Sequence, residues 1–346
     1  SLTDLSGAKV RINLGDPEAS GEWAAAIRQA EHANVAHAPQ WFRVVNNAYG
    51  HTPLYLQSQD TEGRNAVLPA FLVSSRLFGA TISSMPFLDT GGPCSTSDTL
   101  SCALVDALVK EANRLGVDAV ELRCTSPMNL PVPALEDKVN LTLSLPHDPD
   151  HLWRQLNAKV RNQIRKAERS GLSIELGGVE KLDDFYNIFS VNMRDLGSPV
   201  HAQSFFKAVV DTFGSSARIC LVRKGSTPIG GLLALAFKDT IVVPWASSLR
   251  QYFSLCPNML LYWEMIRTAC VEGFRKFDFG RSSRDSNTYH FKRQWGAVEE
   301  QLFWYTISLR ITPFSSTVKQ TTSTSFGLPT VRMVFEFKPP DLYISS

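Results

Sequence analysis

The sequence of 346 residues has no long apolar run. Its best candidate, residues 229–237, is far shorter than the roughly 18–20 residues that a membrane-spanning helix needs, and it contains Gly230 and Gly231. The start of the chain also lacks the features of a secretory signal peptide. We therefore expect a cytoplasmic protein, and we leave open a peripheral contact with the inner face of the cytoplasmic membrane.

Patterned cysteines are missing as well. Zinc sites and disulfide frameworks need close, regular spacing of Cys and His, and none of the cysteines has a close Cys or His partner at such a spacing. We expect buried free thiols and no metal site. The six scattered cysteines are Cys94, Cys102, Cys124, Cys220, Cys256 and Cys270.

An excess of one charge is lacking too, because 35 Lys+Arg oppose 33 Asp+Glu for a formal net charge of +2. This balance argues against a general DNA-binding protein, so an anionic partner would need a local cationic patch. A hydrophobic content of 44% and a charged content of 20% exclude disorder as the main description. The length suits two domains better than one.

Three catalytic signatures are absent from the sequence. There is no G-x-S-x-G, no G-x-x-x-x-G-K-[ST], and no G-x-G-x-x-G after a strand. Covalent serine hydrolysis, P-loop phosphoryl transfer and dinucleotide redox chemistry therefore have no support.

The sequence does contain a faint internal repeat. Both halves show strands, then an amphipathic helix that ends on a glycine, then another strand. In the first half these are residues 54–57, 66–73, 104–116 and 119–123, and in the second half 218–223, 229–237, 241–246, 260–273 and 277–279. We interpret them as two α/β units of one type, although chance alternation of strands and helices is the alternative. Prolines clustered at 131–150 place the boundary there.

The last residues, 311–346, differ from both halves. Residues 312–324 are rich in Ser and Thr, and 328–337 could form a strand or a short helix. We expect a tail packed on the surface.

A basic helix is predicted from Trp153 to Gly171. At about 100° per residue its apolar side chains share one side, and its arginines share the opposite side. Arginine forks suit phosphate, so Arg161 and Arg165 are candidate phosphate ligands. A solvated surface of the helix is the alternative. The apolar side chains are Leu152, Leu156, Val160, Ile164 and Ala167, and the arginines are Arg154, Arg161, Arg165 and Arg169.

The segment 277–296 combines a strand with a polar loop. Alternation places Phe277 and Phe279 on one side of the strand and Asp278 on the other. Gly280 permits a sharp turn. Polar residues beyond the carboxyl end of an α/β strand often bind ligands, although a plain connecting loop is the alternative.

A third candidate region spans residues 243–263. Pro257 and Asn258 give a good helix start, with Asn258 as its cap, and helix starts also bind anions. The cap alone would explain Asn258. Trp245 lies in the preceding strand and is a candidate substrate contact.

Four stretches resemble the Fem-type (FemABX-like) transferases, and most specifically the branch found with exopolysaccharide and protein-sorting gene clusters of Gram-negative bacteria. The resemblance covers about residues 10–310, and the last stretch is the most specific. The stretches are Lys159-x-Arg-x-x-Ile-Arg-Lys-Ala-x-x-x-Gly171, Arg194-Asp-Leu-Gly-Ser-Pro199, Trp245-Ala-Ser-Ser, and Phe277-Asp-Phe-Gly-Arg-Ser with Tyr289-x-Phe-Lys-x-x-Trp-Gly296.

The resemblance implies an α/β fold of two tandem GNAT-like (acyl-CoA N-acyltransferase) domains with mixed, mostly antiparallel sheets. We assign residues 1–140 and 141–310 to the two domains. The implied activity moves an aminoacyl group from aminoacyl-tRNA onto an amine of a cell-envelope precursor related to peptidoglycan or polysaccharide, with no tightly bound cofactor. The long helical-hairpin arm of some Fem-type proteins is not visible here.

Two rival functions stay open. One is an acyl-CoA-dependent GNAT N-acetyltransferase, although the expected Q/R-x-x-G-x-G/A loop before residue 260 is missing. The other is a non-catalytic scaffold that binds a carbohydrate or a lipid carrier.

N-acyl transfer needs a base for the amine and a donor group for the oxyanion. We expect Asp278 to be the base or the amine-orienting carboxylate, with Arg281 and Lys292 stabilising negative charge and Tyr289 as a hydrogen-bond partner. Asp89 is a candidate counterpart from the first domain, and an ordinary turn carboxylate is the alternative there.

Overall fold

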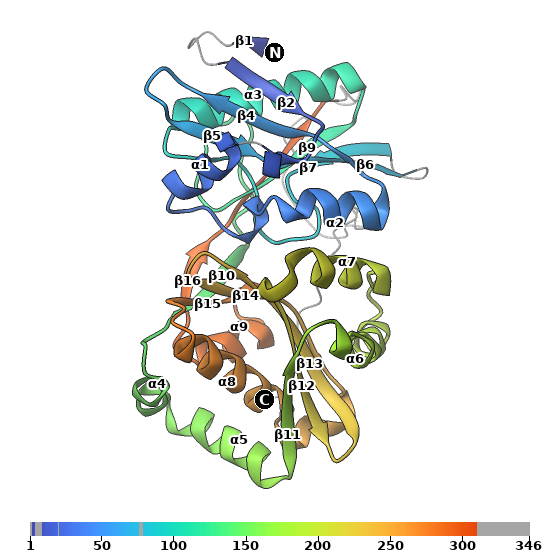
Figure 1. Ribbon diagram of the computed structural model, residues 1–346, viewed down its shortest axis with the longest axis vertical. Helices are drawn as coiled ribbons and strands as arrows, with labels where there is room; N and C mark the ends of the chain where they lie inside the picture. The colour runs from blue at the N-terminus through green and yellow to red at the C-terminus, as the bar shows by residue number, and fades with distance from the viewer. Residues whose placement is uncertain (1, 4–8, 20, 76–78, 310–346) are drawn as a thin grey trace, which may run out of the picture.

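The computed structural model describes residues 2–3, 9–19, 21–75 and 79–309, which form two lobes stacked along the long axis of the molecule (Figure 1). The expected tail at 311–346 lies outside the described residues. None of the described helices is long and apolar enough to cross a membrane.

The first lobe contains two sheets, with strand orders β1-β2-β4-β5-β8 and β17-β9-β7-β6-β3. The strand expected at 66–73 is split at Pro69 into β5 and β6, which belong to different sheets, because proline cannot donate to a ladder. The strands are β1 Leu2–Thr3, β2 Lys9–Asn13, β3 Thr52–Pro53, β4 Tyr55–Gln59, β5 Asn65–Leu68, β6 Phe71–Ser75, β7 Gly79–Ser83, β8 Cys94–Ser95, β9 Ala119–Cys124 and β17 Phe303–Ser308, and the helices are α1 Gly21–Gln29, α2 Gln40–Tyr49 and α3 Asp98–Leu115.

The second lobe is built on one seven-stranded sheet of order β11-β12-β13-β14-β15-β10-β16. Its strands are β10 Lys138–Ser144, β11 Leu172–Gly177, β12 Ala217–Lys224, β13 Thr227–Phe237, β14 Thr240–Ser248, β15 Lys276–Ser283 and β16 Val298–Gln301. Its helices are α4 Pro149–Gln155, α5 Ala158–Arg169, α6 Leu182–Asp195, α7 Gln203–Phe213, α8 Pro257–Val271 and α9 Asn287–Arg293.

The two lobes repeat one arrangement. In each, a long helix connects two strands that pair in parallel: α3 connects β7 with β9, and α8 connects β14 with β15. The other described strand pairs are antiparallel, which confirms the expected fold class. Strand β7, the parallel partner of β9, is one of the elements that the sequence analysis did not predict. Helix α3 ends at Gly116 in the left-handed conformation, as the sequence predicts.

The chain crosses between the lobes more often than a single boundary would allow. After the first lobe the chain forms β10, which pairs with β15 in the seven-stranded sheet of the second lobe. From the second lobe it then returns as β17, which pairs with β9 of the first lobe. Residues 303–308, which we expected in the second domain, therefore complete a sheet of the first lobe.

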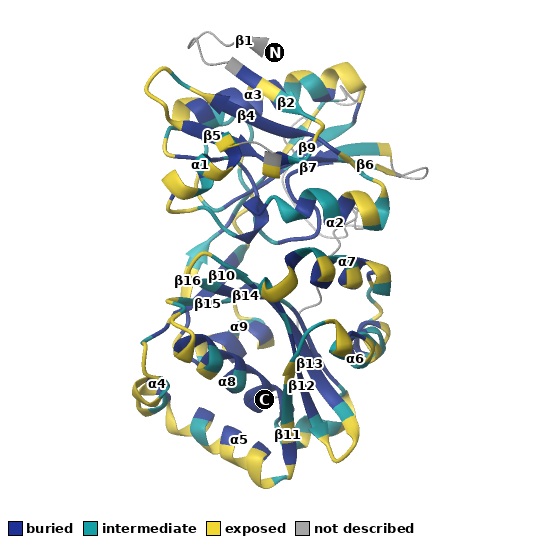
Figure 2. Cartoon of the chain, in the orientation of Figure 1, coloured by how far each residue is buried: buried dark blue, intermediate teal, exposed yellow. Residues whose placement is uncertain are grey.

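A hydrophobic core joins the two lobes in addition to the core that each lobe has of its own. It contains residues of α1 and α2 from the first lobe together with residues of α6 and α7 from the second. Figure 2 shows buried stretches in dark blue on α7 and along the sheets of both lobes. The shared core fixes the lobes against each other, because apolar burial is the main stabilising contribution to folding.

The basic helix is interrupted, which corrects the expectation of one helix over 153–171. Helix α4 ends at Gln155, and the Asn157 side chain caps a new helix by accepting a hydrogen bond from Val160 N. An asparagine cap of this kind marks a helix start. The five expected apolar residues of this region are all buried.

Candidate functional site

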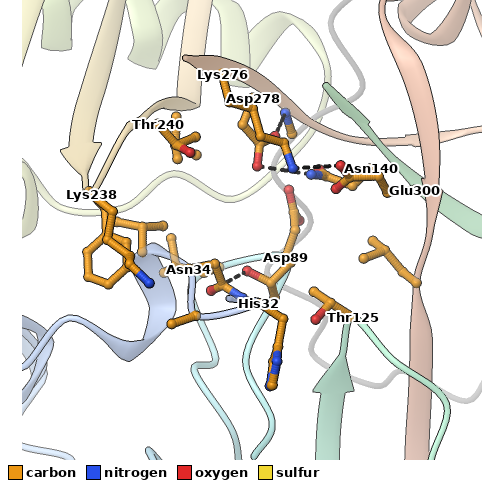
Figure 3. A pocket seen from close by; sticks show the side chains of 18 of the residues that line it. His32, Asn34, Asp89, Thr125, Asn140, Lys238, Thr240, Lys276, Asp278 and Glu300 are labelled. Atoms are coloured by element: carbon orange, nitrogen blue, oxygen red, sulfur yellow. Dashed lines mark hydrogen bonds and ion pairs between the residues drawn. The ribbon is translucent and has the colours of Figure 1, made fainter. Parts of the chain in front are cut away.

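A pocket of about 850 Å³ opens between the lobes (Figure 3). The first lobe contributes the segments around His32 and Asp89, and the second lobe contributes residues of β10, β14, β15 and β16. We call this cavity the junction pocket. Among the candidates named from the sequence, it includes Asp278 and Asp89.

A bulge in β15 shapes one wall of the junction pocket. Opposite β10, Thr142 pairs with Asp278 and Asn140 pairs with Arg281, so β15 has one extra residue in this interval. Gly280 has a φ of 76°, which glycine adopts at little cost in a bulge of this type. The bulge lets Gly280 N donate to Asp278 Oδ1 at 2.7 Å.

The Asp278 carboxylate is bound only by neutral partners. Its second oxygen, Oδ2, accepts from Asn140 Nδ2 at 2.9 Å, and no Lys or Arg of the described segments forms an ion pair with it. Burial raises the pKa of Asp278 above its usual value, and the two hydrogen bonds oppose this rise only in part. A carboxylate with a raised pKa is suited to take a proton.

Strand β10 supplies the polar floor beside this carboxylate. Val139, Leu141 and Leu143 point into the core of the second lobe. Asn140 and Thr142 therefore point to the opposite side of the sheet. Asn140 binds Asp278, and Thr142 donates to Glu300, which neighbours Asn140 on the other flanking strand.

Glu300 is the second carboxylate of this row, and it is compensated. Its Oε1 atom accepts from Thr142 Oγ1 at 2.9 Å and from Lys276 Nζ at 2.6 Å. Figure 3 shows Lys276 and Glu300 joined beside the pair of Asn140 and Asp278.

The other predicted carboxylate, Asp89, forms a buried ion pair across the lobes. Its Oδ1 atom lies 3.0 Å from Arg281 Nε, and its Oδ2 accepts from Arg281 N. The two side chains are only 17% and 6% exposed. The guanidiniums of Arg281 and Arg123 each lie over the Trp304 ring, whose Nε1 donates to Asp89 O. The charge of Arg281 is therefore already neutralised by Asp89.

Lys292 supports the bulge from beneath. Its Nζ donates to Gly280 O at 3.0 Å and to Arg281 O at 2.8 Å, and the residue is 4% exposed. These bonds reach the carbonyls of two consecutive residues at the bulge. In this structure Lys292 positions the strand that carries Asp278.

Asn34 adds a polar group that sequence reasoning missed. Its Oδ1 accepts from Ala36 N and from Thr90 Oγ1, which fixes the orientation of the amide. Its Nδ2 is buried and has no hydrogen-bond partner among the described residues, and Asn34 lines the junction pocket. This amide is therefore a buried donor at the wall of the pocket whose N–H groups have no acceptor among the described residues.

Two of the predicted residues, Tyr289 and Trp245, lie away from this pocket. Tyr289 on α9 donates to Glu299, which raises the pKa of its phenol. Trp245 is 3% exposed and packs edge-on against Phe205 and Phe206 in the core shared by the lobes. Trp245 therefore packs in the core and does not line the junction pocket, where a substrate contact was expected.

Asn258 is the second residue of α8 and not its cap, which corrects that expectation. The cap position is held by Cys256 in a left-handed conformation, and Asn258 Oδ1 accepts from Ser248 Oγ at 2.5 Å. Asn258 also lines a second cavity of about 350 Å³ at the start of α8, together with Lys159 and His290. We call it the α8 pocket.

The two predicted phosphate ligands of the basic helix are engaged within that region. Arg161 Nη1 donates to Leu156 O at 2.6 Å and to two further carbonyls at the end of α4. Arg165 lies over the Trp153 ring at 5.4 Å. Neither residue lines the junction pocket or the α8 pocket.

Comparisons with known proteins agree with this architecture. Residues 154–293 match the sequence model described as an acetyltransferase (GNAT) domain, so the second lobe contains a domain of this type. The match covers less than half of the chain. No curated protein sequence matches significantly.

Solved structures resemble the chain over both lobes. The crystal structure of FemX superimposes with a TM-score of 0.64 at 13% identity, over 86% of this chain and 97% of FemX. A tandem GNAT protein from the clavulanic acid biosynthesis pathway gives a TM-score of 0.54 at 13% identity, over 88% of this chain and 99% of that one. These similarities show a tandem GNAT fold.

A third solved structure also resembles most of the chain. The C-terminal domain of a protein described as a lysylphosphatidylglycerol synthetase from Agrobacterium fabrum gives a TM-score of 0.56 at 12% identity. It covers 85% of this chain and 92% of that domain. At this identity the similarity again concerns the fold.

Proposed function

We propose that the protein is a Fem-type N-acyltransferase that moves an aminoacyl or acyl group onto an amine of a cell-envelope precursor. The observation that carries the proposal is Asp278, an uncompensated carboxylate with a raised pKa in a pocket between two GNAT-type lobes. The GNAT-type domain at 154–293 and the Fem-type motif of residues 277–296 support the same reaction class.

In this proposal the acceptor amine reacts in its neutral form, and the unprotonated Asp278 takes one proton from the nitrogen as the new bond forms. The amine nitrogen attacks the carbonyl carbon of the donor ester, and a new C–N bond forms. As the tetrahedral intermediate collapses, the C–O bond to the donor breaks and the departing oxygen takes the proton that Asp278 held. An amide and a free hydroxyl result, and Asp278 ends unprotonated.

The negative charge on the attacked oxygen needs a hydrogen-bond donor. Asn34 Nδ2 is our candidate, since it is free and its orientation is fixed. Lys292 and Arg281 act indirectly here: Lys292 holds the bulge, and Arg281 binds the lobes together through Asp89.

The donor is proposed to approach through the opening between β14 and β15. Their parallel ladder ends at Val242 and Asp278, although both strands continue further. The α8 pocket, with Lys159 and His290, lies at the start of the helix that connects these strands. Aminoacyl-tRNA is the proposed donor.

An acyl-CoA donor is the second candidate, favoured by the match to an acetyltransferase domain. To decide, we would incubate the protein with an amine acceptor and either tRNA charged with a labelled amino acid or labelled acetyl-CoA. Mass spectrometry of the acceptor and thermal shifts with each donor are the readouts. We expect labelled amide from charged tRNA. If acetyl-CoA alone gave a product and a thermal shift, acyl-CoA would replace aminoacyl-tRNA as the proposed donor. If neither donor gave an amide, the proposed acyltransferase function would be rejected.

A further inference from the structure

A third cavity adjoins the junction pocket on the side of the first lobe. It has a volume of about 400 Å³, lies at the start of α3, and shares His32, Thr125 and Ser126 with the junction pocket. We call it the side pocket. Most of its other polar lining groups are hydroxyl, amide or carboxyl groups, those of Ser95, Thr96, Asp98, Ser101 and Asn129.

Among the described residues, these two cavities have no Lys or Arg without a bonded partner that could bind a phosphate group. No Lys or Arg among the described residues lines the side pocket. The junction pocket has two lysines, and both are engaged: Lys276 binds Glu300, and Lys238 Nζ donates to Ile27 O and Ala30 O. Phosphate recognition relies on free Arg or Lys, so a phosphorylated acceptor finds no partner here.

The carboxylates strengthen this conclusion. Five acidic residues line the junction pocket, and within the part of the chain that the structure describes only Asp89 and Glu300 of these form an ion pair. A pocket with this excess of negative charge repels phosphate and attracts an amine.

The start of α3 does not compensate for the missing cations. The Ser97 hydroxyl accepts from Leu100 N, so one of the free N–H groups is already satisfied. Asp98 places a carboxylate in the first turn, where an anionic ligand would otherwise benefit from the helix dipole.

We infer that the acceptor is an amino sugar, or an amine on a glycan chain, without phosphate near the reacting amine. Sugar hydroxyls both donate and accept, as Ser, Thr and Asn side chains do, so the side chains of the side pocket suit them chemically. The aromatic walls at Phe87, Phe237 and Phe303 offer apolar contact to the sugar carbons. This inference deepens the proposed function and rests on it.

The test measures binding of three probes by titration calorimetry: a glucosamine tetramer, UDP-glucosamine and a lysine-containing peptide. We expect the tetramer to bind at least tenfold more tightly than UDP-glucosamine. Asn129→Leu should weaken tetramer binding by about three- to tenfold, the loss expected for one hydrogen bond. Asn162→Leu is the matched control, because Asn162 is exposed on α5 and lines neither cavity.

Equal or tighter binding of UDP-glucosamine, or no binding of the tetramer, would overturn the inference. Transfer assays on the same probes separate it from the proposed function. Acylation of the lysine peptide alone would keep the acyltransferase and reject the sugar acceptor. Tetramer binding that depends on Asn129 without any acyl product would keep the side-pocket assignment and reject the acyltransferase.

Discussion

Two aspartates that line the junction pocket, one from each lobe, have opposite surroundings. Asp89, from the first lobe, is paired with the buried Arg281 of the second lobe. Asp278, from the second lobe, has only the neutral donors Asn140 and Gly280 N. A charge that is already paired holds a structure together, whereas an unpaired carboxylate with a raised pKa remains available for proton transfer. We therefore expect Asp89 to stabilise the fold and Asp278 to transfer protons in the reaction.

The largest expected effect sharpens the chemical side of this comparison. Asp278→Asn removes the base and keeps the size of the side chain, so kcat/KM for acyl transfer should fall by roughly 10²–10⁴-fold. Steady-state kinetics with the accepted donor measures this loss, and Asp106→Asn, an exposed aspartate of α3, is the control. A variant with unchanged turnover would remove Asp278 from the base role.

The next effect concerns the structural side. Asp89→Leu leaves the Arg281 guanidinium buried without its partner, which typically destabilises a protein by about 3–5 kcal/mol. The double variant Asp89→Leu, Arg281→Met should recover most of this loss, because no uncompensated charge remains. Denaturant unfolding measures both. A single variant as stable as the natural chain would show that the ion pair does not hold the lobes.

A smaller effect is expected at Lys292, which connects the two sides. Lys292→Met leaves Gly280 O and Arg281 O without this donor, and an unsatisfied buried group costs about 1–3 kcal/mol. We expect kcat to fall while KM changes little, since the displaced bulge carries Asp278. If Lys292→Met lowers kcat without any loss of stability, Lys292 acts on the substrate directly.

The repeated fold could be predicted because its signals are local. Helix α3 is capped at its end by Gly116. In the strands of the second lobe, buried apolar residues either alternate with polar ones or form continuous runs. The split at Pro69 and the return of β17 to the first lobe could not be predicted, because they depend on which distant strand offers a free edge.

The site was predictable only in part for a related reason. Asp278 stands out as the polar residue between two phenylalanines of one strand. The pairing of Asp89 with Arg281 is a contact between lobes, so nothing in either segment alone reveals it. Asn140 could have been found as the polar position within the alternating Val139–Leu143 strand, whereas Asn34 depends wholly on tertiary structure.

The smallest effect is a pH dependence of stability that the two aspartates should not share. The folded state raises the pKa of Asp278, so it holds the proton more tightly than the unfolded chain, whose aspartates titrate near about 3.9. The free energy of unfolding therefore falls as pH rises from that value through the raised pKa of the folded state. The transfer rate should rise over the same interval as the base loses its proton.

Asp278→Asn removes this titration and should flatten that part of the stability curve, most visibly as a higher melting temperature than the natural chain at neutral pH. The double variant at Asp89 and Arg281 should retain the slope, because it leaves Asp278 in place. Melting temperatures across the acid range, measured for all three proteins, decide the matter. If Asp278→Asn kept the same slope, another carboxyl group would be titrating in this range. The raised pKa of Asp278, and with it the proposed role of Asp278 in proton transfer, would then be rejected.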